Sequence, residues 1–239
     1  MFTLHNGDCL QYMRSLQSES FDCIVTDPPY GLDFPYAEYS DTRENLIALV
    51  NSFMPEALRV AKRVYVLCGT TQISLYPQPD WVVSIIWNTT GSFGKYGYSQ
   101  WSPVLCYGND LSGFGNVNGI TKSDVLRING GGGVGFTRGK DEKLHTCPKP
   151  ITMMDKVIER FTNIGESVFD PFMGSGTTGV SSVSKQRYFT GCEMTAEYFA
   201  IAEKRVKEAS LQQHLFTPSN TACSGRVDSS GSPELFPAE

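Results

Sequence analysis

The chain has 239 residues, of which 40% are hydrophobic and 19% are charged, and its net charge is −5. This composition is typical of one globular domain of α/β size with appendages, and it argues mildly against a dedicated nucleic-acid scaffold. No apolar run approaches the roughly 18 residues of a membrane span, and the N-terminus lacks the basic and apolar regions of a signal peptide. We therefore expect a cytoplasmic protein without a membrane segment.

Seven cysteines are spread along the chain without a CxxC pair, and several of them lie in apolar, strand-like runs. This distribution favours reduced thiols in the core over disulfides or a zinc site. We expect no bound metal.

In chain order, short apolar runs alternate with segments of helical periodicity. Six runs are predicted as strands, namely Cys23–Val25, Val64–Leu67, Trp81–Trp87, Val104–Tyr107, Val168–Phe169 and Tyr188–Cys192. The spacing of apolar residues predicts helices over Asn45–Ala61, Ile151–Asn163 and Thr195–Ala209. This alternation predicts an α/β fold in which helices cover both faces of a mostly parallel sheet.

Two segments break the alternation. Residues 108–144 are rich in Gly and Asn, and the stretch 110–150 carries a net charge of +2 while the remainder carries −7. A loop of this length inside a compact domain is usually functional or mobile, so a functional insertion and a flexible surface loop are both open. Residues 211–239 are rich in Ser, Pro and Gly, which predicts a disordered tail.

The run FDCIVTDPPYG joins a predicted strand to a pair of prolines. Residues 21–25 are apolar enough for a buried strand, and Pro28 and Pro29 end any helix or ladder because neither has an N–H group. The chain therefore leaves the strand in a stiff loop that carries Asp27 and Tyr30. Taken alone, this stretch is better explained as a turn, because Asp-Pro commonly initiates one.

The run ESVFDPFMGSGTTGVSS predicts a strand, a tight turn at Gly174-Ser175-Gly176, and a helix that begins at Thr177. Glycines between a strand and a helix let the backbone approach a ligand, and the helix start offers free N–H groups. About 20 residues on, the strand RYFTGCE ends at Glu193, where dinucleotide-type α/β folds place an acid that binds ribose hydroxyls. The phosphate patterns GxGxxG and GxxxxGK[ST] are incomplete or missing, so we expect a nucleoside ligand without a pyrophosphate.

Together with DPPY, these motifs resemble those of S-adenosylmethionine-dependent DNA amino-methyltransferases. DPFMGSGTT resembles the cofactor loop of that family, DPPY its catalytic tetrad, and NGDCLQYMRSL the segment whose acid, here Asp8, binds the adenine of the cofactor. HTCPKP resembles the family's HPTQKP element at His145, Lys149 and Pro150 but departs from it at residues 146–148. The tetrad precedes the cofactor loop, which is the β-type motif order, and the resemblance covers about residues 3 to 209.

The resemblance implies a fold and a set of site residues. The fold is α/β, a class I Rossmann-like methyltransferase with a mixed seven-stranded sheet and helices on both faces. The implied catalytic residues are Asp27, Pro28, Pro29 and Tyr30. The residues implied to bind S-adenosylmethionine are Asp8, Lys149, Asp170, Phe172, Gly174, Ser175, Gly176, Thr177 and Glu193. Three alternatives stay open: Asp8 as a helix N-cap, Lys149 as a solvated lysine and Phe172 as a core side chain.

The tetrad suits methylation of an exocyclic amine, whose lone pair is delocalised into the base and is therefore a poor nucleophile. Acceptors around its N–H groups favour a pyramidal nitrogen, and Asp27 offers a carboxylate while Pro28 offers a carbonyl in a fixed direction. Tyr30 offers a face on which a flipped base stacks. Aspartate in the tetrad favours adenine N6 in double-stranded DNA. Cytosine N4 comes second, because the members of the family that methylate cytosine N4 more often carry serine at this position. Methylation of protein glutamine or RNA, and a DNA-binding module without catalysis, are further alternatives.

The resemblance also divides the chain into a catalytic domain over 1–209 and a disordered tail over 210–239, and it implies a bacterial or phage-encoded restriction-modification enzyme. The segment from about 108 to 145 is expected to be an inserted target-recognition region. Its candidates for phosphate contacts, which position DNA without specifying its sequence, are Lys122, Arg127, Arg138, Lys140 and Lys143. The small size of this region and the acidity of the chain predict weak or partner-assisted DNA binding, for which a homodimer is one arrangement.

Overall fold

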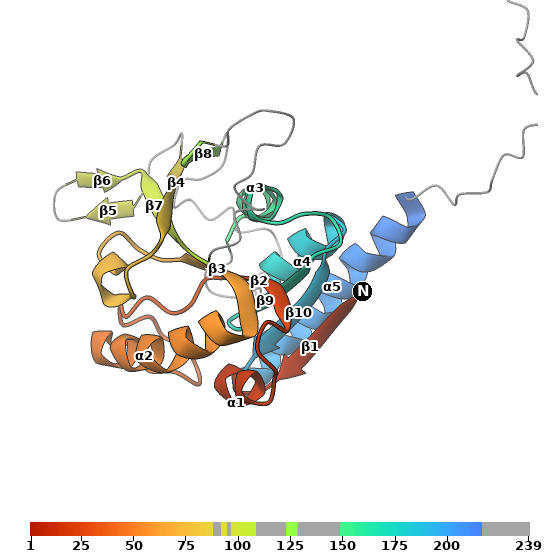
Figure 1. Cartoon of the computed structure of the whole chain (residues 1–239), viewed down its shortest axis with the longest axis horizontal. Coiled ribbons are helices and arrows are strands. Elements are labelled where there is room, and N and C mark those ends of the chain that lie inside the picture. The colour runs from red at the N-terminus through yellow and green to blue at the C-terminus, as the bar shows by residue number, and fades with distance from the viewer. Residues whose placement is uncertain (88–91, 95–96, 109–122, 129–148, 217–239) are drawn as a thin grey trace, which may run out of the picture.

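The computed structural model describes residues 1–87, 92–94, 97–108, 123–128 and 149–216. Its main feature is an eight-stranded sheet in the order β1-β10-β9-β2-β3-β7-β4-β8 (Figure 1). These strands are β1 (Phe2–Asn6), β2 (Phe21–Thr26), β3 (Ala61–Leu67), β4 (Trp81–Trp87), β7 (Trp101–Tyr107), β8 (Val125–Ile128), β9 (Ser167–Asp170) and β10 (Tyr188–Glu193). Strand β7 is antiparallel to both β3 and β4, and the other neighbouring pairs are parallel.

Helices lie on both faces of this sheet, as the alternation of strands and helices predicts. They are α1 (Cys9–Arg14), α2 (Arg43–Val60), α3 (Ile151–Phe161), α4 (Thr177–Ser184) and α5 (Ala196–Phe216), and a short 3-10 turn, η1, spans Ile73–Leu75. A separate two-stranded hairpin is made by β5 (Ser92–Gly94) and β6 (Gly97–Ser99). Parallel neighbours that follow one another in the chain need crossover connections. Helix α2 connects β2 to β3, and α4 connects β9 to β10.

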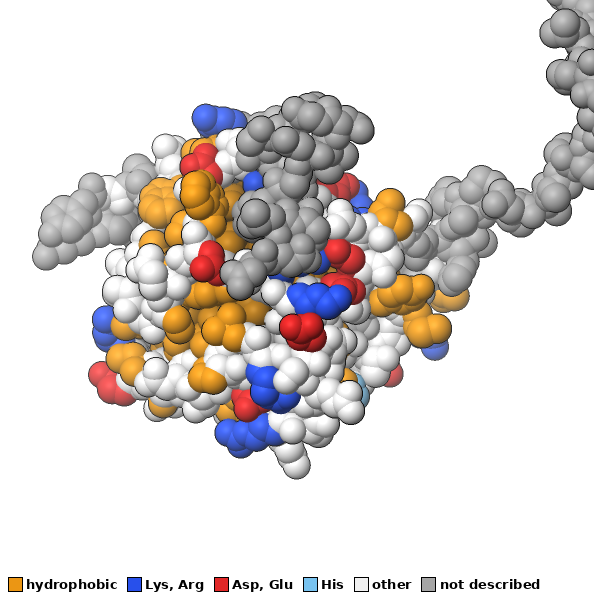
Figure 2. Space-filling model, viewed as in Figure 1, with side chains coloured by type: hydrophobic (Ala, Val, Ile, Leu, Met, Phe, Trp, Pro, Cys, Tyr) orange, Lys and Arg blue, Asp and Glu red, His pale blue; other side chains and the backbone are white. Residues whose placement is uncertain are grey.

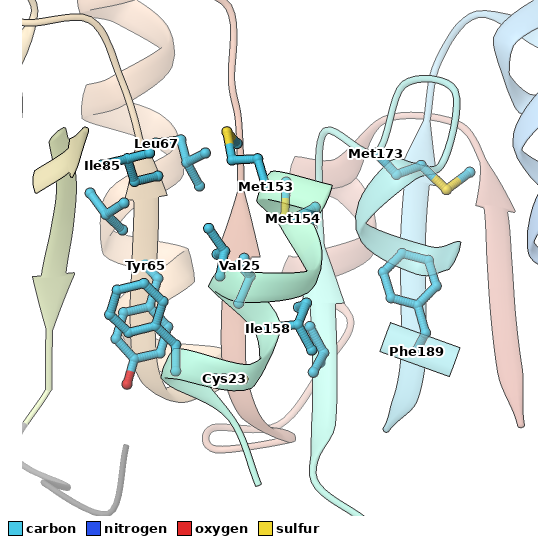
Figure 3. Close-up of a cluster of buried hydrophobic side chains, with 14 of the residues drawn as sticks. Cys23, Val25, Tyr65, Leu67, Ile85, Met153, Met154, Ile158, Met173 and Phe189 are labelled. Atoms are coloured by element: carbon cyan, nitrogen blue, oxygen red, sulfur yellow. The ribbon is translucent and has the colours of Figure 1, made fainter. Parts of the chain in front are cut away.

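Alternation along the central strands divides the core into two clusters. In β2, Cys23 and Val25 face the cluster that contains α3, α4 and α5, whereas Ile24 between them faces the cluster that contains α1 and α2. In β3, Tyr65 faces the cluster with α3, α4 and α5, and Val64 faces the cluster with α1 and α2. Figure 3 shows α3 lying across β2 and β3, with its methionines over the side chains of the first cluster. Because successive side chains of a strand point to opposite faces, the central strands must be apolar on both sides.

All six predicted strands are present. The helix predicted to begin at Thr177 and the three other predicted helices are present as well, with ends that shift by up to seven residues. Strands β1, β5, β6 and β8 and helix α1 are present in addition to the predicted elements. The predicted count of seven strands is therefore corrected, because β8 adds a parallel strand at the outer side of β4. Its residues fall in the segment that was expected to be an insertion, so part of that segment belongs to the sheet.

The predicted start of the tail at residue 210 is wrong, because α5 continues to Phe216. The run from 201 to 217 contains neither Gly nor Pro, and the first breaker is Pro218. The Ser, Pro and Gly content of the segment comes from residues beyond that point. Residues 217–239 lie outside the described part of the chain.

Five of the seven cysteines are described, and all five are buried free thiols, as predicted. Cys147 and Cys223 lie outside the described residues. In the part of the chain that the structure describes, no helix is long and apolar enough to cross a membrane. Those residues also contain no cluster of three or more His, Cys, Asp or Glu side chains that could hold a metal ion.

Candidate active site

The two motifs singled out in the sequence follow neighbouring parallel strands. Cys23 pairs with Val168 and Ile24 with Phe169, so β2 and β9 end at the same edge of the sheet. From β2 the chain continues through α2 to β3, while from β9 it continues through α4 to β10 on the other side. The chain therefore departs in opposite directions from this pair, which is where ligands bind in open α/β sheets.

A cleft of about 390 Å³ lies at this edge, between the loop after β2 and the loop after β9. It is lined by every predicted catalytic residue and by every predicted cofactor residue except Gly176. The lining residues in these two sets are Asp8, Asp27, Pro28, Pro29, Tyr30, Lys149, Asp170, Phe172, Gly174, Ser175, Thr177 and Glu193. In Figure 2, hydrophobic side chains gather on the surface over the region between α2 and β7, with charged side chains at their border.

The loop after β2, which carries the predicted catalytic residues, is held by contacts among three polar side chains. Tyr30 donates its hydroxyl to Asp27 Oδ1 at 2.7 Å, and Lys149 Nζ lies 2.8 Å from Asp27 Oδ2. Burial, and then the negative charge of Asp27, raise the pKa of Tyr30 well above its usual value. The tyrosine hydroxyl therefore stays protonated and acts as a donor to the carboxylate.

The segment after the tetrad is organised by Asp41, a buried residue that the sequence analysis missed. Its Oδ1 accepts from the backbone N–H of Gly31 at 2.6 Å, and its Oδ2 accepts from those of Leu32 and Phe34 at 3.0 and 3.2 Å. Gly31 has a φ of +67°, which favours glycine at this turn. Asp41 thus satisfies three backbone donors and fixes the wall of the cleft beside Tyr30.

Asp170, at the end of β9, faces inward rather than toward solvent. Its Oδ1 accepts from the Thr26 hydroxyl at 2.7 Å and from the backbone N–H of Phe172 at 3.0 Å. Burial raises the pKa of Asp170 to about 6, although hydrogen bonds from Thr178, Thr26 and Phe172 oppose the shift. The hydrogen bonds of Asp170 to Thr26 and Phe172 therefore join the end of β2, directly before Asp27, to the loop after β9.

The glycine turn that begins α4 is shaped by positive backbone angles and by close packing. Gly174 and Gly176 have φ values of +52° and +81°. A Cβ on Gly176 would lie 2.9 Å from the Cβ of Ala202 in α5, so only glycine fits between the two helices. Gly176 therefore serves the approach of α4 to α5 and does not line the cleft.

Arg205 of α5 holds the same turn from outside the cleft, and the sequence analysis missed it. Its Nη1 donates to the backbone oxygen and the hydroxyl of Ser175 and lies 3.4 Å from Oγ1 of Thr177. Burial lowers the pKa of this guanidinium. The periodicity of α5 gives no sign of this role, because the contact depends on how α5 packs on α4.

Glu193 ends β10 and faces the turn, as the spacing of the two motifs predicts. Its Oε2 accepts from the backbone N–H of Gly174 at 3.1 Å, and its Oε1 accepts from that of Thr195 at 2.8 Å. Burial raises the pKa of this carboxyl. Hydrogen bonds from Thr195, Gly174 and Met194 oppose this shift.

Asp8 and Phe172 show the structural role that was left open for each, and both also line the cleft. Asp8 is the N-cap of α1, where its Oδ1 accepts from the backbone N–H of Leu10 at 2.7 Å. Phe172 packs edge-on against Phe53 of α2 with ring centroids 5.1 Å apart. A structural contact and a ligand contact are compatible at both positions.

The residues at this end of the cleft fit an adenosine-type cofactor. Leu10, Phe172 and Tyr198 supply apolar and aromatic surface for a flat ring. Glu193 supplies carboxylate oxygens for ribose hydroxyls, and the turn before α4 supplies backbone close to the ligand.

Only one of the predicted DNA contacts falls within the described residues. Arg127 lies in β8 with an exposed side chain, and its backbone oxygen accepts from Lys156 Nζ at 2.7 Å. The other four, Lys122, Arg138, Lys140 and Lys143, lie outside the described residues.

Comparison with known proteins gives a consistent assignment. A family described as "DNA methylase", that of the N6/N4 methyltransferases, matches residues 115–204. Over this segment the chain resembles the N6/N4 DNA methylases. Consistent with the β-type motif order, the matched region contains the cofactor loop, and the catalytic tetrad lies before it.

Several relatives match most of the length of this chain. The type II methyltransferase M.HinfI of Haemophilus influenzae is 25% identical over 250 residues, which cover 86% of this chain and 68% of that protein. The DNA adenine methyltransferase YhdJ of Escherichia coli K12 is 27% identical over 245 residues, which cover 87% of this chain and 83% of that protein.

A solved structure confirms the predicted fold class. The complex of M1.HpyAVI with S-adenosylmethionine superposes with a TM-score of 0.63 and 22% identity over 86% of this chain and 99% of that one. The chain thus has an α/β, Rossmann-like fold, as predicted, and the proteins that it resembles in sequence are DNA methyltransferases.

Proposed function

We propose that this methyltransferase transfers a methyl group to N6 of adenine in duplex DNA, on a base that is flipped out of the helix into the cleft. The observation that carries the proposal is that Asp27 and the cofactor loop line one cleft, although they are far apart in the sequence. Aspartate in the tetrad favours adenine, and the relative YhdJ is named a DNA adenine methyltransferase.

The chain's own residues serve to bind and orient the reacting groups. Asp27 accepts a hydrogen bond from the exocyclic amine, and the carbonyl of Pro28 accepts a second, so that the nitrogen lone pair becomes localised. Tyr30 supports the flipped base by stacking. S-adenosylmethionine, when bound, supplies an electrophilic methyl group. Rate acceleration then comes mainly from holding amine and methyl group in line, and Asp27 need not be a strong base.

The cofactor is placed by the other half of the cleft. We assign the ribose hydroxyls to Glu193 and the adenine ring to the surface near Asp8 and Phe172, on the support of their places in the lining and of the sequence motifs. Gly174, Ser175 and Thr177, at the turn before α4, would hold the cofactor on this side of the cleft. Asp170 supports this arrangement through Thr26 and Phe172 without a solvent-facing role.

DNA contacts outside the cleft are assigned to the basic residues of the segment from about 108 to 145, of which Arg127 is exposed on β8. Phosphate contacts make binding depend on salt, because they release counterions. A series of DNA dissociation constants at increasing salt is expected to give a clearly negative slope for the wild type and a smaller one for Arg127→Ala. A near-zero wild-type slope would remove the phosphate assignment.

The test of the reaction is direct. Unmethylated duplex DNA is incubated with S-adenosylmethionine and the protein, digested to nucleosides and analysed by mass spectrometry, with Asp27→Ala as the control. N6-methyladenine that appears only with Asp27 present supports the proposal. N4-methylcytosine would keep the mechanism and overturn the base, while methylation of RNA or glutamine peptides alone would overturn the DNA substrate.

A further inference from the structure

Both carboxylate oxygens of Asp27 are already occupied by neighbouring side chains. Oδ1 accepts from the Tyr30 hydroxyl at 2.7 Å, and Oδ2 lies 2.8 Å from Lys149 Nζ. The same ammonium group donates to the Tyr30 hydroxyl at 3.2 Å and lies 4.8 Å from the centroid of the Tyr30 ring. One lysine therefore contacts both groups that the proposed reaction assigns to the target base.

These contacts compete with the base. The ammonium of Lys149 and an exocyclic amine are both hydrogen-bond donors, and both require the free lone pairs of the Asp27 carboxylate. The ammonium over the Tyr30 ring also covers a face on which a base would stack. Lys149 therefore competes with the base both for the Asp27 carboxylate and for the Tyr30 ring.

The side chain of Lys149 is able to move while its backbone stays in place. It precedes Pro150, whose carbonyl accepts from the backbone N–H groups of Met153 and Met154 at 3.1 Å, which fixes the start of α3. The lysine side chain is 25% exposed and lines the same cleft as Ser175. Its flexible four-carbon stem lets the charged end exchange one anionic partner for another.

S-adenosylmethionine brings such an anion into this cleft, because it carries a free carboxylate on its methionine part. We propose that Lys149 is a positioning residue that masks Asp27 until the cofactor binds and then pairs with the cofactor carboxylate. This exchange frees Asp27 Oδ2 and the ring of Tyr30 for the base. The part that concerns the base rests on the proposed function, whereas the part that concerns the cofactor does not.

The cofactor part is tested by a double-mutant cycle on S-adenosylmethionine binding, measured by isothermal titration calorimetry without DNA. If Lys149 must give up Asp27 to bind the cofactor, Asp27→Asn removes the competing partner and tightens binding, on the order of fivefold. In the Lys149→Gln background, binding is weaker and Asp27→Asn weakens it further, because only an attraction to the sulfonium is lost. Lys149→Arg keeps the charge and is expected to keep the tightening.

The outcome is decided by the sign and size of the coupling. If Asp27→Asn changes the dissociation constant by the same factor with and without Lys149, the two side chains are not coupled and the proposal is overturned. Lys207→Gln, at an exposed position of α5, controls for the loss of a positive charge. Melting temperatures of every variant show whether a change in binding comes from unfolding. If Lys149→Gln is unfolded, the effect of Asp27→Asn on cofactor binding is measured in the Lys149→Arg background instead.

The DNA part uses a duplex that contains the site methylated in the nucleoside experiment. S-adenosylhomocysteine keeps the carboxylate without the reactive methyl, and it is expected to tighten wild-type DNA binding by roughly fivefold or more. The Lys149→Gln variant should bind this DNA equally well with and without it. If DNA is methylated but the variant keeps the coupling, this inference alone fails. If no DNA is methylated, the proposed function fails, and the calorimetric cycle still decides the cofactor part.

Discussion

The hydroxyl of Thr26 donates a 2.7 Å hydrogen bond to Oδ1 of Asp170, and both residues are buried. Thr26 is the last residue of β2 and Asp170 the last of β9. The bond therefore connects the two loops of the cleft at their starting points, one residue before the tetrad. We expect this contact to help fix the position of Asp27 relative to the loop after β9.

Thr26→Val tests that connection, because valine has nearly the shape of threonine without the hydroxyl. Loss of a hydrogen bond to a charged group is expected to destabilise the fold by about 1.5–3 kcal/mol. Turnover should fall as well, since Asp27 follows directly in the chain. Urea unfolding and the initial methylation rate measure the two effects, with Thr26→Ser as the control that keeps the hydroxyl. Equal stability of the valine and serine variants would contradict the assigned role.

The raised pKa of Asp170 predicts a pH dependence. Burial moves this pKa from 3.8 to about 6, so the folded state binds the proton more tightly than the unfolded state. The contribution of this carboxyl to stability therefore falls as the pH rises through the interval between these values and is constant above it. Relative to Asp170→Asn, the wild type should lose on the order of 3 kcal/mol over that interval. Urea unfolding of the wild type and Asp170→Asn at about four pH values between pH 4 and pH 7.5 checks this. A difference in unfolding free energy that stays constant with pH would refute it.

The contrast between DPPY and Asp41 shows what the sequence can and cannot predict here. The tetrad and the glycine turn are recognisable because each is a local pattern at the end of an apolar run. Asp41 and Arg205 act on backbone that lies in another element, and only tertiary packing brings them there. The strand β8 was missed for a similar reason, because its four residues pair with β4 across a long separation in the chain.

Asp41 predicts a second test of the catalytic loop. Asp41→Asn keeps the shape of the side chain but replaces one acceptor oxygen by a donor group, which then faces backbone N–H donors. Faster amide exchange of Gly31, Leu32 and Phe34 is expected in hydrogen-exchange experiments, together with a reduced methylation rate. Asp33→Asn, an exposed position in the same segment, is the matched control. Unchanged exchange at these three amides would show that Asp41 does not organise the segment.

Gly176, in the turn before α4, and Gly165, between α3 and β9, form a pair that separates backbone strain from packing. Gly176 and Gly165 have φ values of +81° and +82°, but a Cβ would lie 2.9 Å from Ala202 at the first and would meet nothing within 4 Å at the second. Gly165→Ala should therefore cost only the left-handed penalty of roughly 1–2 kcal/mol. Gly176→Ala should cost clearly more and weaken S-adenosylmethionine binding, and Ala202→Gly should restore part of the loss. Equal costs in urea unfolding would contradict the packing argument.

Arg205 predicts a change in cofactor binding from a residue outside the cleft. Arg205→Met keeps the long apolar stem but removes the donors to Ser175 and Thr177, so the turn is held less firmly. We expect S-adenosylmethionine binding to weaken about tenfold, which corresponds to roughly 1.4 kcal/mol, with a smaller change in kcat at saturating cofactor. The dissociation constant of Arg205→Lys should lie between those of the wild type and Arg205→Met, because one ammonium group cannot make the paired hydrogen bonds of a guanidinium. Isothermal titration calorimetry measures these dissociation constants, and Lys204→Gln, at an exposed position of α5, is the control. An unchanged dissociation constant for Arg205→Met would show that the turn holds its shape without the arginine.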